Sequence, residues 1–358
     1  MSKGLFLGRE PESGEDVRIK PERLRTHGVV VGMTGSGKTG LSLVLLEELI
    51  KEKVPIIAID PKGDLGNLGL LFRDLAPDAF APWVGEANPM EVSLRWRAGI
   101  AKWGLSPETV TTLRDGVDFR LYTPGSEAGV SVNLLGSFGR PGAATLADGA
   151  ARRELVAGTV SGLLGLLGKT PDPVKDPAHI ILSKILEAAW LGGEDPTLET
   201  LILRLVDPPF EKVGVFPLDR FFPPDDRMDL AMTLNGVIAS PAFTPWTQGV
   251  AMDLDGMLAK ADKTPVHVFS LAHLGESERQ FFLAILLGQL MAWSRRQPGT
   301  EDLRAALFFD EVAGYIPPYP ANPPTKAPLL TMMKQARAVG FGVILATQNP
   351  VDLDYKAL

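Results

Sequence analysis

The sequence predicts an α/β protein in which a mostly parallel sheet, covered by helices on both faces, carries an inserted, mostly helical subdomain. Three observations predict this class. Short apolar runs typical of buried strands alternate with helical patterns near both ends of the chain, these runs end in acidic or polar residues, and the segment between them has helical periodicity. Uninterrupted apolar strands are typical of parallel sheets that are buried on both faces.

The first α/β unit lies between His27 and Asp60. Residues 28–31 (GVVV) are a β-branched run, residues 38–53 carry apolar side chains around most of a helix, and residues 54–59 (VPIIAI) are entirely apolar. This order of strand, helix and strand predicts a βαβ unit.

The second α/β unit is C-terminal. Its expected elements are a strand at 266–271, a helix at 277–296, a strand at 305–310, a helix at 329–339 and a strand at 341–347. A proline-rich loop precedes the second helix. The alternation again predicts parallel strands joined by helices.

A different pattern lies between the two units. One more strand is expected at 117–122, and helices follow at 150–167, 178–191, 198–206 and 227–240. We therefore divide the chain into a discontinuous core, residues 1–136 and 251–358, and a helical insertion subdomain, residues 137–250.

Composition excludes several classes of protein. The 358 residues include no cysteine, which excludes a disulfide scaffold, a cysteine-ligated zinc site and a thiol nucleophile. The N-terminus lacks a secretory h-region, and the longest purely apolar run, residues 281–287, is too short to span a bilayer. We expect a cytoplasmic protein that does not insert into membranes. The net charge of −7 argues against a broadly basic surface for nucleic acid.

Residues 32–39, GMTGSGKT, match the phosphate-binding pattern G-x-x-x-x-G-K-[ST]. Glycines let backbone N–H groups surround phosphate oxygens, and the next helix adds the positive end of its dipole. The lysine would neutralise the β- and γ-phosphates, and the threonine hydroxyl would bind Mg²⁺. The pattern predicts a nucleoside triphosphate site formed by Gly32, Thr34, Gly35, Ser36, Gly37, Lys38, Thr39 and Gly40.

The acid pair Asp310–Glu311 follows the apolar run AALFF. A carboxylate at the end of a buried strand adjacent to the P-loop can hold Mg²⁺, and we assign this role to Asp310. The next acid, Glu311, can polarise the attacking water as a general base. An acid pair favours ATP hydrolysis over nucleotide storage, because storage needs no base.

Three further residues are candidates for the same site. Gln348 ends the last strand and could contact the γ-phosphate or the attacking water. Arg337, in the helix before that strand, could stabilise phosphoryl charge in its own or a neighbouring site. Asp60 ends the strand after the P-loop helix and would point into the same crevice, but a structural role in the turn DPKGD stays open.

Other patterns in the sequence give weaker evidence about function. Residues 60–63 match the D-x-x-G of GTPases, but no N-K-x-D sequence for guanine recognition occurs. The four histidines lack metal-ligand spacing. Three tryptophans, Trp83, Trp96 and Trp103, lie near basic residues, as in some nucleic-acid sites. We favour the alternative that they are partly buried aromatics under a loop.

The blocks HGVVVGMTGSGKTG, IAIDPKGDL, LFFDEVAGYIPP and KQARAVGFGVILATQNPVDLDY together resemble the HerA–FtsK group of P-loop ATPases, and bacterial HerA-like proteins in particular. Conjugative coupling ATPases are a more distant resemblance. The arginine of KQAR and the glutamine of ATQNP are both typical of the group.

The resemblance implies a RecA-like core, a homo-hexameric ring with ATP and Mg²⁺ bound between subunits, and translocation along double-stranded DNA. It also implies a NurA-type nuclease as partner in DNA end processing or defence. Lys38 and Thr39 would lie at the phosphates, Asp310 and Glu311 would be the Walker B pair, Gln348 the sensor, and Arg337 the interface arginine. The family pattern extends beyond both ends of this sequence, so we expect a fragment of a longer protein.

Two other functions stay open. One is a nucleotide-gated scaffold that recruits a nuclease or other effector with little turnover, which the acidic charge and the helical insertion favour. The other is a conjugative coupling-type pump, for which the sequence provides no membrane anchor.

Overall fold

The computed structural model describes residues 4–134, 138–169 and 171–355. Its centre is a six-stranded sheet in which every neighbouring pair is parallel. From one edge to the other, the strands are β3 (Gly28–Val31), β10 (Phe341–Thr347), β9 (Ala305–Phe309), β4 (Ile56–Asp60), β8 (Thr264–Ser270) and β5 (Val117–Tyr122). The predicted α/β class is confirmed.

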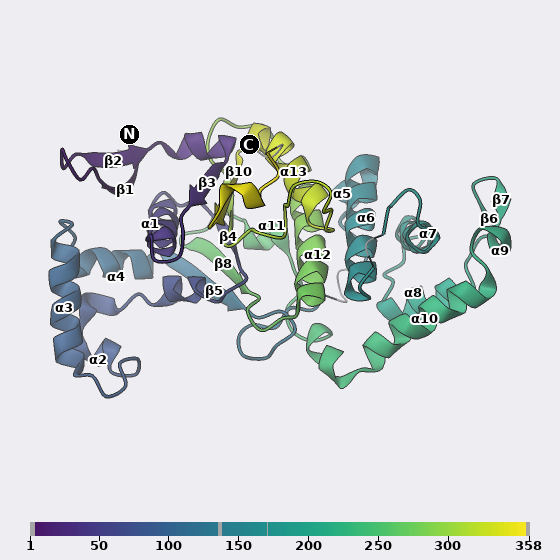
Figure 1. The fold of residues 1–358 in the computed structure, drawn as a ribbon, viewed down its shortest axis with the longest axis horizontal. Coiled ribbons are helices and arrows are strands. Elements are labelled where there is room, and N and C mark those ends of the chain that lie inside the picture. The colour runs from purple at the N-terminus through teal and green to yellow at the C-terminus, as the bar shows by residue number, and fades with distance from the viewer. Residues whose placement is uncertain (1–3, 135–137, 170, 356–358) are drawn as a thin grey trace.

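Helices cover both faces of the sheet because its strands are apolar on both faces (Figure 1). Alternate residues of β4 show the division: Ile57 and Ile59 pack into the cluster that contains α12 (Glu276–Arg295) and α13 (Lys326–Gln335). Ile56 and Ala58 pack into the opposite cluster, which contains α1 (Lys38–Lys51) and Leu113 of α4 (Pro107–Asp115). Successive residues of the strand thus point alternately into the two apolar clusters on opposite faces of the sheet.

The order of the strands corrects one expectation. The strand that ends at Asp310 does not lie next to the P-loop strand, because β10 lies between β3 and β9. The carboxyl ends of parallel strands meet at one edge of a sheet. The end of β10 therefore emerges between the P-loop and the acid pair.

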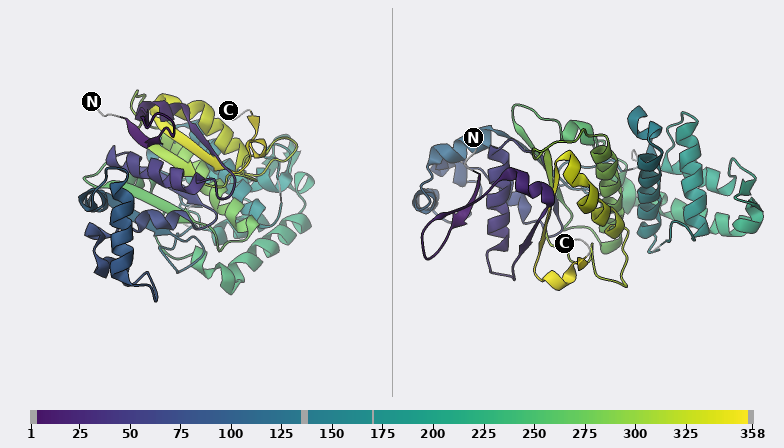
Figure 2. Two further views of the ribbon diagram at one scale, coloured as in Figure 1. Left: turned by 60° about the vertical axis from the view of Figure 1, so that its left-hand side comes forward. Right: turned by 90° about the horizontal axis from the view of Figure 1, so that it is seen from above.

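A second group of helices lies beyond α12 (Figures 1 and 2). These helices share an apolar cluster of their own, with buried residues from Phe138 to Leu234. We continue to propose residues 137–250 as an insertion subdomain. Its helices are α5 (Ala143–Ala147), α6 (Gly149–Leu166), α7 (Pro177–Leu191), α8 (Leu198–Val206), α9 (Leu218–Phe221) and α10 (Pro224–Ala239), with a small hairpin of β6 (Lys212–Val213) and β7 (Phe216–Pro217).

Several elements were not predicted. An antiparallel hairpin of β1 (Leu5–Arg9) and β2 (Asp16–Ile19) precedes the first strand of the six-stranded sheet. Between β4 and β5 the chain forms α2 (Pro77–Phe80), α3 (Pro89–Ala101) and α4, and a short α11 (Leu254–Met257) precedes β8. Within the described residues, none of the helices has the length and apolar character needed to cross a membrane.

Two glycines bring α6 close to α12. A Cβ atom on Gly158 would lie 3.4 Å from the carbonyl oxygen of Ala284. A Cβ atom on Gly162 would lie 3.1 Å from the carbonyl oxygen of Phe281 and 3.3 Å from the Cβ atom of Ala284. The two helix backbones therefore approach each other at positions where only a small residue fits.

We predict that Gly162→Leu destabilises the protein by about 1–3 kcal/mol, because the larger side chain overpacks this contact. The matched control is Gly236→Leu in α10, where an added Cβ meets nothing within 4 Å. Leucine has the higher helix propensity, so the control should be neutral or stabilising. Urea unfolding measures both variants, and equal effects would contradict the proposed contact.

Candidate nucleotide site

The loop of residues 32–37 joins β3 to α1 and needs glycine at three positions. Gly35 and Gly37 have φ values of 80° and 93°, in the left-handed region that favours glycine. A Cβ atom on Gly32 would lie 2.4 Å from the Ser36 Oγ atom. The Gly32 N–H donates to the Thr347 carbonyl at 3.1 Å, which ties the loop to the end of β10.

Lys38 begins α1 and is buried. Its ammonium pairs with Asp310 Oδ1 at 3.4 Å and also with Glu311 Oε1. A buried ammonium requires such partners, because an unpaired charge in the interior is costly. The predicted P-loop lysine and the predicted acid pair thus lie together in the structure.

Three donors meet at one oxygen of Glu311. Its Oε1 atom accepts from Lys38, from Lys62 at 2.8 Å and from the Gln348 amide at 3.0 Å. Burial by itself raises the pKa of the Glu311 carboxyl, but hydrogen bonds from these three side chains outweigh burial and lower the pKa to about 2. Glu311 is therefore a fully ionised carboxylate at neutral pH.

The backbone of Glu311 is strained. Its φ of 44° is uncommon for a residue other than glycine. The flanking residues are held on both sides: the Asp310 N–H donates to Ile59 at 3.0 Å and the Val312 N–H donates to Ala346 at 2.9 Å. Such strain persists only where the surroundings fix the conformation, and it is typical of functional sites.

Gln348 connects the P-loop to the acid pair. Its Nε2 amide donates to Glu311, and its Oε1 atom accepts from the Thr34 hydroxyl at 3.3 Å. This position follows from the strand order, since Gln348 directly follows β10.

Asp60 is fully buried, with an exposed fraction of 0%. Its carboxylate accepts backbone N–H groups from Gly63 at 2.7 Å, Asp64 at 3.2 Å and Leu65 at 2.9 Å. The pKa of the Asp60 carboxyl is raised, chiefly by burial and also by the nearby charge of Asp310, although the backbone hydrogen bonds partly offset this shift. Of the two roles left open, the structure favours the structural turn over direct nucleotide contact.

Arg337 lies at the amino end of β10, whereas the nucleotide site lies at the carboxyl ends of the strands. It is an exposed residue of the 3-10 helix Ala336–Val339, which precedes β10, whereas Gln348 follows β10. The strand of seven residues separates them by about 20 Å at ~3.3 Å per residue. Arg337 therefore cannot reach the nucleotide site of its own chain.

The oxygen donors at this site suit magnesium. Mg²⁺ is usually held by one or two side-chain oxygens together with substrate phosphates, so it needs no larger ligand cluster. The Asp310 carboxylate and the Thr39 hydroxyl are of this kind. In the part of the chain that the structure describes, no group of three or more histidine or acidic residues forms another candidate metal site.

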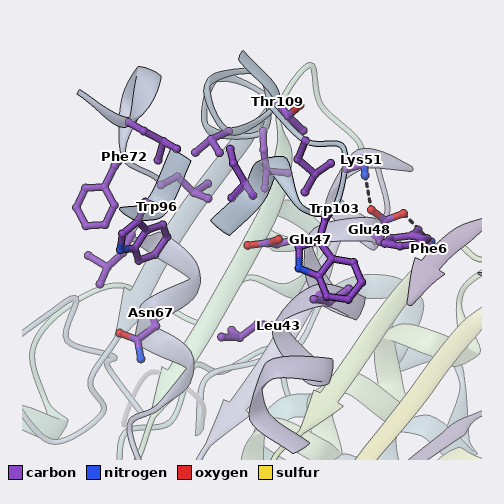
Figure 3. A pocket seen from close by; sticks show the side chains of 18 of the residues that line it. Phe6, Leu43, Glu47, Glu48, Lys51, Asn67, Phe72, Trp96, Trp103 and Thr109 are labelled. Carbon is purple, nitrogen blue, oxygen red and sulfur yellow. Dashed lines mark hydrogen bonds and ion pairs between the residues drawn. The ribbon is translucent and has the colours of Figure 1, made fainter. Parts of the chain in front are cut away.

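The three tryptophans lie away from the P-loop, and their side chains are only partly buried. Trp96 belongs to α3, and Trp83, Trp96 and Trp103 have exposed fractions of 63%, 47% and 49%. Together with Phe6 of β1 and Glu47 of α1 they line a cavity of about 1020 Å³ (Figure 3). No P-loop residue is among its described lining residues, so this cavity is separate from the nucleotide site.

Comparison with known proteins supports the resemblance to HerA-like P-loop ATPases that the sequence motifs indicate. Residues 5–116 match the family model described as "Helicase HerA, central domain", and no curated protein matches the chain in sequence. VirB4 of Thermoanaerobacter pseudethanolicus has a similar structure, with a TM-score of 0.57 and 16% identity over 98% of this chain and 78% of that chain.

The bacterial conjugative coupling protein TrwB is also similar. Its complex with the GTP analogue GDPNP has a TM-score of 0.54 and 12% identity over 98% of this chain and 69% of that chain. Its complex with the ATP analogue ADPNP gives 0.51 and 12% over 97% and 68%.

The parallel sheet, its helical layers and the P-loop geometry define a protein with a RecA-like core. The HerA match and the structural similarity to VirB4 and TrwB confirm the predicted resemblance to the HerA–FtsK group of P-loop ATPases.

We predict that Asp60→Ala destabilises the protein by at least about 2 kcal/mol, because three backbone N–H groups lose their acceptor. Asp60→Asn keeps one acceptor oxygen and should have a smaller effect. Urea unfolding and hydrogen exchange of the Leu65 amide measure the loss. The exposed Asp262→Ala is the control, and an unchanged Leu65 amide in Asp60→Ala would refute this role.

Proposed function

We propose that the chain is the ATPase motor of a HerA-type ring that hydrolyses ATP and moves along double-stranded DNA. The observation that carries this proposal is the meeting of groups from three strand ends: the Lys38 ammonium pairs with both Asp310 and Glu311, and the Gln348 amide donates to Glu311. These groups supply the parts that hydrolysis needs: a cation for phosphate, a metal ligand, a base and a polar group that orients water.

The chemistry follows from these residues. ATP phosphates at the P-loop would take Lys38 away from the acid pair, because the triphosphate offers several oxygens to the ammonium. Thr39 and Asp310 would hold Mg²⁺, which when bound neutralises charge on the β- and γ-phosphates. Glu311 would then accept the proton of the attacking water while Gln348 orients that water.

The position of Arg337 supports a ring. An exposed arginine about 20 Å from its own site cannot stabilise phosphoryl charge there, so such a role would have to fall on a neighbour's site. We therefore propose a homo-hexamer with ATP bound between subunits. Double-stranded DNA in the ring and a NurA-type nuclease as partner are proposed from the HerA resemblance. The net charge of −7 does not oppose this, because only the pore of a ring needs basic residues.

A nucleotide-gated scaffold is the second candidate function. The observation that favours it is the low pKa of Glu311, about 2, which makes this carboxylate a weak base while all three donors bind it. A conjugative coupling-type pump is a third candidate, which the structural similarity to TrwB favours.

We predict that duplex DNA stimulates ATP hydrolysis and that Glu311→Gln lowers kcat by about 10²–10⁴-fold, the contribution of a general base. Binding of a fluorescent ATP analogue should persist in this variant and be lost in Lys38→Ala. The exposed Glu301→Gln is the matched control. A rate of ATP hydrolysis that does not change when duplex DNA is added would contradict the proposed DNA motor. ATP binding without turnover in the wild-type protein would favour the nucleotide-gated scaffold.

We predict that Lys38→Ala and Arg337→Ala subunits, each inactive alone, regain ATPase activity when mixed. A mixed ring contains interfaces at which an intact Lys38 meets an intact Arg337 of the neighbour. Steady-state hydrolysis across a series of mixing ratios measures the recovery. Activity that stays at zero at every ratio would contradict the assignment of Arg337 in trans.

A further inference from the structure

Lys62 is a residue of the nucleotide site that the sequence analysis did not identify. Its ammonium lies 2.8 Å from Glu311 Oε1, and its side chain is 47% exposed, whereas that of Glu311 is 13% exposed. An ion pair between two exposed side chains contributes little to stability. Here one partner is largely buried, so the pair is better shielded from water.

The loop that carries Lys62 is held in place by buried groups. The Asp60 carboxylate binds three backbone N–H groups that follow Lys62, and the Asp60 carbonyl accepts from Leu271 at 2.8 Å, next to the end of β8. Gly63 has a φ of 91°, which allows the tight turn. The fold therefore fixes the position of the Lys62 backbone beside Glu311.

The contacts of the Glu311 carboxylate are asymmetric. The hydrogen bonds and ion pairs from described residues all fall on Oε1, and none of them falls on Oε2. Oε1 thus anchors the side chain, and Oε2 is the oxygen left to receive a proton. When ATP takes Lys38, two anchors remain on Oε1, and Lys62 is the one that carries charge.

We propose that Lys62 is a positioning residue for hydrolysis: it holds Glu311 by Oε1 after Lys38 has moved to the phosphates, so that Oε2 faces the attacking water. This inference rests on the proposed ATPase function. Lys62 acts through Glu311 and contributes little to nucleotide binding. Its exposed side chain can also adjust as the base changes its hydrogen bonds.

Lys62→Ala should lower kcat about 10–100-fold, the equivalent of losing one charged hydrogen bond, and leave KM for ATP within about twofold. Lys62→Arg, which keeps the charge and the donor, should restore most of the rate. The exposed Lys263→Ala is the control. In the Glu311→Gln background, Lys62→Ala should have almost no further effect, because the carboxylate that it positions is gone.

Three outcomes would overturn the proposal: unchanged or faster turnover in Lys62→Ala, a raised KM with kcat unchanged, or an equal loss of kcat with and without the Glu311 carboxylate. A crystal structure of the wild-type protein with Mg²⁺ and ADPNP tests it without turnover. The Lys62 ammonium should stay within hydrogen-bond distance of Glu311, and its loss would refute the proposal. A wild-type protein that lacks ATPase activity would contradict the proposed function and, with it, the role of Lys62 in hydrolysis, whereas loss of the contact in an active protein would contradict the role of Lys62 alone.

Discussion

The burial of the Lys38 ammonium is the constraint on which the site depends. A cation in the interior needs anions beside it, and the two acids that meet this need follow a strand far away in the sequence. In the sheet, β10 lies between the P-loop strand β3 and β9, which these acids follow. The strand order thus brings the acids and the lysine to the same end of the sheet.

Much of the fold could be predicted because its signals are local. The helix at 198–206 agrees at both ends with α8, and the strand at 341–347 agrees with β10. The hairpin of β1 and β2 was missed because its strands are short and partly charged. The strand order could not be predicted, because a run of apolar residues does not identify its neighbours.

Within the candidate site, patterns of adjacent residues located the P-loop and the acid pair, and their roles remain predictions. Lys62 was missed because its partner, Glu311, is distant in sequence and no motif joins the two. The turn DPKGD was the available signal: a buried acid that binds backbone amides three to five residues later fixes the lysine between them. The tryptophans show a further limit, because no local pattern predicted the cavity that Trp83, Trp96 and Trp103 line.

The close contact between α6 and α12 has a mechanical consequence. Where Gly158 and Gly162 bring two helix backbones together, the nearest atoms of α12 are mostly backbone atoms and the Cβ of Ala284, so little flexible side chain lies between the helices to absorb movement. Helix α12 also packs into the core cluster that contains β4, β8 and β9. A load applied to α6 is therefore transmitted to the sheet through a stiff joint, and the helices beyond α12 are mechanically linked to the strands that end at the nucleotide site.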